Sequence, residues 1–414
     1  MHVVVLGAGV VGVATAYNLA RDGHDVTVIE REAGPAMGCS HANAGLINGH
    51  TAVPWSAPGI PAMVLKEFWR DDAPYRVRLR ADPAMALWIA RFFGNCTTTR
   101  TREIKTRLRR LSTYSFEMLQ ALRATENIAY DAQTNGLIYL YRDPEALDAA
   151  QQVAAGGSDP RAHPIRLSLE ETLEREPALR RTTCRYAGAL LYDKDETGDA
   201  RLFTEGLSRA AVQRGARFLF GQPVTAIRTE GNKVCGVGMA EGNLDADAVV
   251  VAAGTGSARL LGPFGLRLPV YPVKGYSATV EVGDWGALPR HALQDVQRKI
   301  TMTPLGSRLR AAGTAELAGH NTTIDARRAA NLHTHMRAML PDAAGDAIPV
   351  YWAGLRPMTP DSLPILGATP VDGLWLNTGH GSLGWTMACG SGRIIADLIV
   401  GKSSPISLDG LSLR

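Results

Sequence analysis

The chain has 414 residues, of which 45% are hydrophobic, and its 44 basic and 40 acidic side chains leave a net charge of +4. This composition is typical of a folded globular protein, and the length allows two or three domains. The small net charge argues against nucleic acid as the main partner.

The cysteines and the apolar runs indicate the cellular compartment of the protein. Five cysteines are spread along the chain without a Cys-x-x-Cys pair, which argues for reduced thiols and against a disulfide framework or a zinc site. No apolar run reaches the roughly 18 residues that a membrane-spanning helix needs. A glycine motif begins at residue 7, which leaves no room for a cleavable leader. We therefore expect a cytoplasmic protein that binds no metal.

Residues 1–30 predict a βαβ unit. Residues 3–6 are a continuous apolar run typical of a buried strand, and residues 25–30 predict a second strand that ends in an acid. Residues 13–21 between them have a helical pattern. A G-x-G-x-x-G motif joins the first strand to the helix, which is the context in which this motif binds a dinucleotide. The motif consists of Gly7, Ala8, Gly9, Val10, Val11 and Gly12.

Each glycine of the motif has a physical role in holding a dinucleotide. Gly7 permits the tight turn, Gly9 lets the backbone approach a pyrophosphate, and Gly12 lets the helix pack closely on the strand. Glu30 ends the second strand, where its carboxylate can accept hydrogen bonds from a ribose and would repel a 2′-phosphate, so NADP is disfavoured. The motif alone does not separate FAD from NAD, and a glycine turn without a ligand is the remaining alternative.

The segment after the second strand, residues 39–46, is a second candidate for cofactor contact because it is small and polar. A loop here would run under an extended dinucleotide, and small side chains would let its backbone N–H groups reach the cofactor. The same residues also suit a plain loop. The candidates are Ser40, Asn43, Ala44, Gly45 and Leu46.

Residues 62–126 have a helical pattern and form an excursion from the first domain. The region 55–110 combines apolar residues in its first part with six basic side chains between residues 100 and 110, against one glutamate. Such a pattern suits a peripheral contact with an anionic membrane surface. It equally suits a buried apolar side and a solvated basic helix face, and both alternatives stay open.

The middle of the chain predicts a second, mostly antiparallel sheet, because strand-like segments follow one another with short turns. These segments are residues 136–141, 187–192, 270–282, 299–304 and 308–313. Other segments return to the first domain, with a helix at 202–213 and buried strands at 216–220 and 247–253.

A glycine-rich segment near the C-terminus favours FAD over NAD. Residues 379–386 precede a helix that runs to about residue 400, and the positive end of this helix could face the flavin pyrimidine carbonyl, which becomes anionic on reduction. A plain glycine-rich connection is the alternative. The candidates are Gly381, Ser382, Leu383, Gly384, Trp385 and Thr386.

Several segments, in order along nearly the whole chain, resemble the D-amino-acid-oxidase-like superfamily of FAD enzymes. They are the N-terminal glycine motif, Ser40-x-x-Asn43-Ala44-Gly45, residues 250–254, residues 352–361 and the segment that begins at Gly379. Within the superfamily, residues 54–59, 271–277 and 374–392 resemble the bacterial D-amino acid dehydrogenases.

The resemblance implies a non-covalent FAD, because Pro-Met-Thr follows Arg356 where some relatives carry the cysteine that binds the flavin. It also implies oxidative deamination of a D-amino acid to a 2-oxo acid and ammonia. The electrons would pass to a respiratory quinone or an electron-transfer partner rather than directly to oxygen. The further cofactor contacts expected are Arg31, Val224, Ala253 and Gly254.

We therefore predict an α/β fold with a discontinuous, Rossmann-like FAD-binding domain and a second, mostly antiparallel α+β substrate domain. The predicted ranges are 1–60, 195–265 and 350–414 for the first domain, and 61–194 and 266–349 for the second.

A substrate amino acid needs one cation for its carboxylate, and Arg356 is the candidate. A planar guanidinium binds a carboxylate through two parallel hydrogen bonds and so fixes the orientation of the α-hydrogen toward the flavin. The alternative is a structural ion pair between Arg356 and an acid such as Asp361.

Four other side chains are candidates for the same pocket. Lys274 lies between apolar positions of a predicted strand and would sit near the flavin ring, unless it reaches to solvent. Tyr271 and Tyr276 flank it and would contact the carboxylate or wall the pocket, although both also suit a simple core. His380 would touch the flavin edge. It is not needed as a base, because the lone pair of an uncharged amine can assist hydride loss.

Two rival functions remain open at this point. An enzyme of the same fold could oxidise glycine, sarcosine or a D-proline derivative. A protein of another class could be an FAD-binding subunit that passes electrons within a heteromeric complex. Ser-His-Asp hydrolysis is not expected, because no Gly-x-Ser-x-Gly lies between a strand and a helix.

Overall fold

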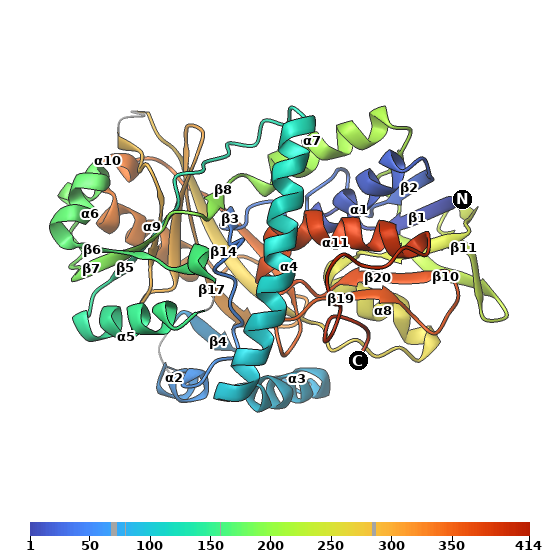
Figure 1. The fold of residues 1–414 in the computed structure, drawn as a ribbon, viewed down its shortest axis with the longest axis horizontal. Helices are drawn as coiled ribbons and strands as arrows, with labels where there is room; N and C mark the ends of the chain where they lie inside the picture. The colour runs from blue at the N-terminus through green and yellow to red at the C-terminus, as the bar shows by residue number, and fades with distance from the viewer. Residues whose placement is uncertain (68–72, 79, 158, 284–286) are drawn as a thin grey trace.

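The computed structural model describes residues 1–67, 73–78, 80–157, 159–283 and 287–414. Two lobes lie side by side, each built on its own β-sheet, and the long helix α4 (Thr98–Thr125) runs across the front between them (Figure 1). Both chain ends lie on the first lobe, on the right of Figure 1.

The sheet of the first lobe has six strands in the order β19-β20-β13-β1-β2-β9. All neighbours are parallel except the antiparallel pair β19 and β20. Valine-rich strands such as His2–Leu6 suit this place because both of their faces are buried. The strands are β1 (His2–Leu6), β2 (Asp25–Ile29), β9 (Arg217–Leu219), β13 (Ala248–Val251), β19 (Ile365–Ala368) and β20 (Leu374–Thr378).

Helices cover one face of this sheet and a small β-meander covers the other. The helices are α1 (Val10–Arg21), α7 (Ala200–Gln213) and α11 (Gly384–Ile399), and α11 packs between α1 and α4. Its contact with α4 is close enough for the N–H of Gly390 to donate to Ser115 Oγ at 2.9 Å. The opposite face packs against α8 (Ser257–Leu261) and the meander β10 (Val224–Glu230), β11 (Lys233–Met239) and β12 (Gly242–Asp245).

The second lobe has a nine-stranded sheet in which β14, the longest strand, lies between β17 and β18. Its pairs are antiparallel except β5 with β15 and β4 with β17. The strands are β4 (Tyr75–Val77), β5 (Leu137–Tyr141), β6 (Ile165–Ser168), β7 (Gly188–Tyr192), β14 (Tyr271–Glu281), β15 (Ala292–Asp295), β16 (Ile300–Leu305), β17 (Arg308–Leu317) and β18 (Val350–Met358).

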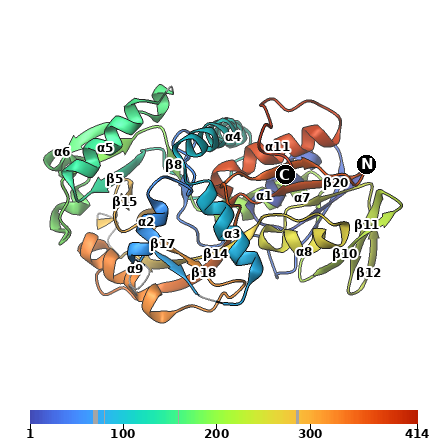
Figure 2. The same cartoon turned by 90° about the horizontal axis from the view of Figure 1, so that it is seen from below.

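Helices pack on both faces of β14. On one face lies α9 (Ala326–Met339), followed by the short α10 (Pro341–Ala344). On the other face lies α3 (Pro83–Gly94), beside α2 (Ile60–Glu67), and both are near the viewer when the molecule is seen from below (Figure 2). The remaining elements are α5 (Pro144–Ala155), α6 (Leu169–Arg175) and the two-stranded link of β3 (Leu46–Ile47) with β8 (Glu196–Thr197).

The predicted α/β class and mostly antiparallel second sheet are confirmed, and the structure corrects one boundary. Residues 350–358 were expected in the first domain, but β18 pairs with β14 along nine residues and so belongs to the second sheet. The meander at residues 224–245 was not predicted, because its short, half-exposed strands lack a buried apolar run. None of the described helices is both long and apolar enough to cross a membrane.

Candidate active site

The glycine turn between β1 and α1 has the geometry that its sequence predicts. Gly7 has a φ of +107° and donates its N–H to Ile29 O at 2.8 Å. A Cβ at Gly12 would fall 1.9 Å from Gly7 O, so a side chain there would prevent α1 from packing. Around Gly9 the space is open, since its Cβ would meet only Ser40 Oγ, at 3.5 Å.

The residues that follow β2 gather at this turn. Glu30 accepts a hydrogen bond from the N–H of Ala8 at 2.7 Å, which places its carboxylate beside the turn. Ser40 Oγ accepts from the N–H of Val10 at 3.1 Å and so holds the loop at the start of α1. Arg31 projects outward and pairs with Glu32. The open turn, the helix start at Gly9, which has no capping side chain of its own, and the adjacent carboxylate fit an FAD pyrophosphate and ribose.

Two further predicted cofactor segments also lie near the turn. A Cβ at Gly7 would fall 2.7 Å from Ala252 O, so the segment of Ala253 and Gly254 lies directly against the glycine motif. Val224 begins β10 and packs on the other face of the sheet, in the cluster that contains Ile29. Its contact with FAD stays a prediction.

The loop at residues 43–48 connects the two lobes. The buried Arg310 of β17 donates to Asn43 O at 3.2 Å, and Asn43 Oδ1 accepts from the N–H of Gly45 at 2.9 Å. At the other end of the loop, the N–H of Asn48 donates to Thr386 Oγ1 at the start of α11. These contacts bring Asn43, Ala44, Gly45 and Leu46 beside the segment at residues 381–386.

The start of α11 packs against the end of β18. Gly381 has a φ of +57°, and a Cβ there would fall 2.5 Å from Met358 Sδ. No side chain caps the helix at Leu383, so its N-terminal backbone donors and positive dipole are available to an acceptor. Met358 lies two residues beyond Arg356, which places Arg356 close to this helix start.

Arg356 extends from β18 across β14. A Cβ at Gly275 would fall 2.3 to 2.5 Å from the guanidinium Nη1, Nη2 and Cζ. Nη1 donates to Thr314 O of β17 at 3.1 Å. The indole of Trp55 covers the group, with its ring centroid 5.4 Å from Cζ.

The charge of Arg356 has no counter-ion among the described residues. Asp361, the alternative partner considered above, instead pairs with Arg414 at 2.7 Å. Burial lowers the pKa of Arg356, which means that the protein alone stabilises its charge poorly. A half-buried guanidinium without a carboxylate is a ready partner for a carboxylate from outside the chain.

Apolar and aromatic side chains surround this guanidinium. Trp88, Tyr271, Val273 and Met358 form one cluster, and Trp55 packs against it. The Tyr271 hydroxyl donates to Asp82 at 2.7 Å, so Tyr271 walls the site and its hydrogen is already used. Arg356 therefore lies beside an apolar and aromatic wall.

The structure separates Lys274 and Tyr276 from this site, which corrects the prediction that they share it. Val273 is opposite Arg356 in the register of β14 with β18, so the neighbouring Lys274 and Tyr276 point to the other face. There the Tyr276 hydroxyl donates to Glu316 at 2.8 Å, and Lys274 Nζ lies 3.7 Å from the same carboxylate. Lys274 is buried, and it does not face the loop at residues 40–48, called the cofactor loop below.

His380 and Cys39 lie at the edge of the candidate site. His380 is buried, its Nε2 lies 3.2 Å from Ser391 Oγ, and burial lowers its pKa to about 3, so it is neutral. Burial also raises the pKa of the Cys39 thiol, while the nearby Arg356 guanidinium lowers it. His41 stacks on Trp352 at 5.9 Å. The cofactor loop and the Arg356 face of β18 are thus neighbours.

A buried polar cluster beside the loop was not predicted. The Asp195 carboxylate accepts from the N–H of His50 at 3.1 Å, from Asn48 and from Thr51. Burial raises the pKa of Asp195 to about 6.

Sequence reasoning also missed Trp55 and Thr314 as neighbours of Arg356, because neither belongs to a catalytic residue type. The described residues hold no group of His, Cys, Asp or Glu suited to a metal ion.

Comparison with known proteins gives consistent results. The profile of the FAD dependent oxidoreductase family matches residues 2–398. The D-amino acid dehydrogenase of Cereibacter sphaeroides is 45% identical, over 100% of this chain and 95% of that protein. The enzyme of the same name from Rhizobium rhizogenes is 43% identical, over 100% and 99%. Among solved structures, glycine oxidase from Geobacillus kaustophilus superposes with a TM-score of 0.76 at 26% identity, covering 100% of this chain and 98% of that one.

Proposed function

The chain belongs to the family of FAD-dependent oxidoreductases, and on that premise we propose that it oxidises D-amino acids to 2-oxo acids and ammonia. The names of relatives that are 43% to 45% identical, over 95% to 99% of their own length, support this substrate class. The observation that carries the proposal is Arg356, a half-buried cation that has no ion-pair partner among the described residues and lies beside the cofactor loop.

The chain's own residues bind and orient the substrate. Arg356 binds the α-carboxylate. Two parallel hydrogen bonds from one edge of the guanidinium fix the direction of the α-carbon. Trp55 and Tyr271 keep water from the carboxylate and so strengthen this ion pair. The bound flavin supplies the acceptor for the hydride.

Proton handling needs no acid–base pair from the protein. His380 is neutral at physiological pH and its Nε2 faces Ser391, so it supplies no charge. An amine that binds uncharged uses its own lone pair to assist hydride loss. Hydrolysis of the resulting imino acid by water gives the 2-oxo acid and ammonia.

The test is reduction of the bound flavin without oxygen. We expect a panel of D-amino acids to bleach the absorbance of the purified protein, and the matching L-amino acids to leave it unchanged. The variant Arg356→Met serves as a control that retains FAD but loses bleaching at the same substrate concentration. Bleaching by L-amino acids alone, or by no amino acid, would contradict the proposal.

We also propose that FAD is held without a covalent bond, through the turn at residues 7–12, Glu30 and the loop at residues 40–46. Acid or heat should release intact FAD into the supernatant. Flavin that stays with the denatured chain, or NAD in its place, would contradict this assignment.

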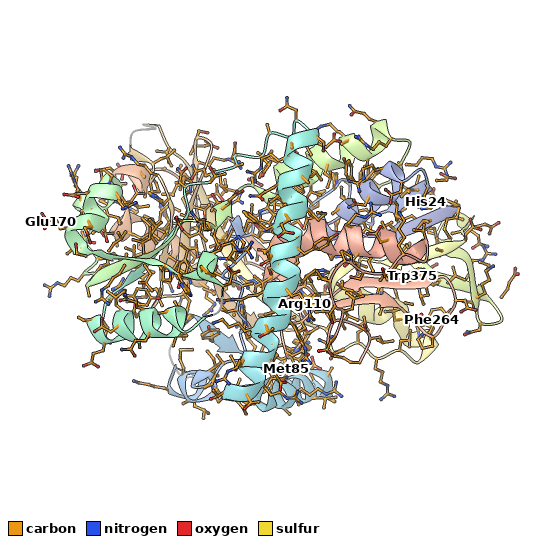
Figure 3. The ribbon with its side chains drawn as sticks, viewed as in Figure 1. His24, Met85, Arg110, Glu170, Phe264 and Trp375 are labelled. Atoms are coloured by element: carbon orange, nitrogen blue, oxygen red, sulfur yellow. The ribbon has the colours of Figure 1, made fainter. Side chains whose placement is uncertain are left out.

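A second proposal within the function is that a membrane quinone accepts the electrons. Leu65, Leu87 and Phe93, on α2 and α3, are 72%, 54% and 39% exposed. They belong to the edge of the molecule where Figure 3 shows Met85, while Arg110 lies further along α4. Exposed apolar side chains at one edge suit insertion into a lipid interface.

Only part of the predicted membrane region is available for that contact. Met85, Trp88 and Phe92 are buried, and Phe68 and Trp69 lie outside the described residues. Arg107 pairs with Asp409 at 2.9 Å, and Arg110 donates to Asp409 O at 3.0 Å. These two arginines therefore hold the C-terminal residues, so the apolar edge is the better candidate.

Sedimentation with anionic phosphatidylglycerol vesicles tests the contact. We expect Leu87→Glu with Phe93→Glu to abolish vesicle binding and quinone reduction while leaving dye reduction intact. The control is Ile348→Glu, at a site that is 89% exposed in the second lobe. Equal vesicle binding by the double variant and the control would reject this edge as the anchor.

Glycine oxidation is the second candidate function, because the structure of a glycine oxidase superposes over the whole chain at 26% identity. The bleaching panel decides between the two. Faster reduction by glycine or sarcosine than by any D-amino acid would favour this alternative. Flavin that no amino acid reduces would favour an electron-transfer subunit.

A further inference from the structure

A distorted part of β17 accepts the hydrogen bond of Arg356. Lys274 pairs with Glu316 and Tyr276 pairs with Gly313, so Thr314 and Ala315 of β17 stand opposite Gly275 alone. This is a β-bulge, which changes the direction in which local groups point. Here it directs the carbonyl of Thr314 at Arg356 Nη1, 3.1 Å away.

Thr314 is held in a backbone conformation that its side chain disfavours. Its φ is +63°, and among the described non-glycine residues with positive φ it is the only β-branched one. A β-branched residue such as threonine is strained there, because its branched Cβ crowds the backbone. Its Oγ1 is buried and has no hydrogen-bond partner in the described part of the chain. The Thr314 side chain therefore makes no hydrogen bond to the described residues that would offset the backbone strain. The Thr314 carbonyl, in contrast, accepts the hydrogen bond from Arg356.

The other side of the guanidinium is fixed by the absence of a side chain. Gly275 lies under Arg356, and a single Cβ there would fall within 2.5 Å of Cζ, Nη1 and Nη2. The guanidinium can lie flat on β14 only because this position is glycine. Trp55 then covers it, so the group has contacts below, above and at one end.

We propose that Thr314 and Gly275 are positioning residues that hold Arg356 in one orientation and leave its remaining N–H groups for a single substrate carboxylate. The proposal rests on the proposed function, because it assigns the ligand of Arg356. Strain at Thr314 is the structural sign of this arrangement. An arginine held in advance in its binding orientation loses little freedom when the carboxylate arrives.

The first test is Gly275→Ala, with Ser277→Ala as its matched control. Ser277 lies on the same face of β14, two residues away, and its Oγ has no partner in the described residues. The probe is butyrate, whose dissociation constant is read from the flavin spectrum of the holoenzyme, and butyramide is its neutral counterpart. For Gly275→Ala we expect a rise of about tenfold or more in the butyrate constant and in KM. Butyramide binding, FAD content and the saturated kcat should change by less than about twofold.

The second test varies Thr314. Thr314→Gly keeps the positive φ accessible but frees the backbone, so we expect KM to rise about threefold or more while Tm stays level or increases. Thr314→Asn, which tolerates positive φ, should restore KM to within about twofold of the parent. If Gly275→Ala does not fold, this pair decides the question.

The outcomes separate this proposal from the proposed function. Butyrate binding needs no turnover, so equal butyrate constants for the parent, Gly275→Ala and Thr314→Gly would overturn the positioning role even if D-amino acids bleach the flavin. Parallel losses of butyrate and butyramide binding would also overturn it, because they indicate a general change of the pocket. A parent that binds butyrate but is bleached by no amino acid would instead overturn the proposed function.

Discussion

Each face of β14 holds a cation, the buried Lys274 on one and the half-buried Arg356 on the other, and the partners of the two cations differ. On one face Lys274 lies near the Glu316 carboxylate, which also pairs with Arg78 and Arg328 and accepts from Tyr276. On the other face lies Arg356, which extends from the neighbouring strand β18. Its partners are a backbone carbonyl and an indole ring, and no carboxylate pairs with it in the described structure.

This difference distinguishes a structural cation from a ligand-binding one. Burying a charge is costly unless it is paired, so a protein that leaves one unpaired needs an external partner to complete the site. The Glu316 carboxylate has its cations within the protein, and through Arg328 it joins α9 to β17. In the proposed function, a substrate carboxylate completes the Arg356 face.

The variant with the largest expected effect is Arg356→Met, which tests whether Arg356 binds a ligand or supports the fold. Two charge-assisted hydrogen bonds contribute about 3–6 kcal/mol together, so kcat/KM should fall by roughly a hundredfold or more. The Tm should stay level or increase, because the variant removes an unpaired buried charge. Arg356→Lys should give a smaller rise in KM, of at least about tenfold, since an ammonium cannot reproduce the guanidinium fork. A large loss of Tm in Arg356→Met would show that the cation is structural.

Glu316→Gln should have the opposite signature. Leaving the cations without their carboxylate should lower the free energy of unfolding by about 3–5 kcal/mol, measured in urea, with KM of the folded enzyme within about twofold. Burial raises the pKa of Glu316, but hydrogen bonds from Arg78 and Tyr276 outweigh this effect and hold the pKa below its ordinary value. Its stabilisation is therefore present at neutral pH and is lost as pH falls through the folded-state pKa. The gap between parent and variant should shrink in acid.

Asp195 extends the comparison to a buried acid, whose hydrogen-bond donors among the described residues are all uncharged. Burial raises its pKa to about 6, so it favours folding below its unfolded-state pKa, near 4, and that contribution is lost as pH rises through about 6. We expect Asp195→Asn to be more stable than the parent at pH 8 and equal to it at pH 4. Urea unfolding across this range measures the difference. A gap that does not vary with pH would mean that folding does not shift the pKa of Asp195.

The smallest effect is expected for Tyr271→Phe. Tyr271 lies on the Arg356 face, but its hydroxyl donates to Asp82 at the start of α3. Losing one hydrogen bond should lower the free energy of unfolding by about 1 kcal/mol. We expect KM to change by less than about threefold in steady-state assays. A rise like that of Arg356→Lys would assign the hydroxyl to the carboxylate.

The cofactor half of the site could be predicted from the sequence because its parts are local. The turn at residues 7–12, the acid at Glu30 and the helix start near residue 384 each depend on a few neighbouring residues and on backbone geometry. The family match confirms the FAD class to which they point. Their individual contacts with FAD stay predictions.

The substrate half could not be predicted to the same depth, because it depends on which face a side chain takes. Lys274 and Tyr271 are three residues apart in one strand, and so they point to opposite faces. The bulge at Thr314 and the covering indole of Trp55 arise from strands and loops far apart in sequence. No local pattern marks either residue.

The position of α11 has a consequence for how the protein is made. Its contacts join residues separated by 275 positions, from Gly390 to Ser115, and by 371 positions, from Arg393 to Asp22. The core of the first lobe thus closes only after the last segment of the chain has left the ribosome. Until then α1 and α4 present apolar surface that nothing covers, and long-range closure of this kind is slow. We expect refolding of the full chain to be slow and prone to aggregation, with the yield decided by how fast α11 reaches its place.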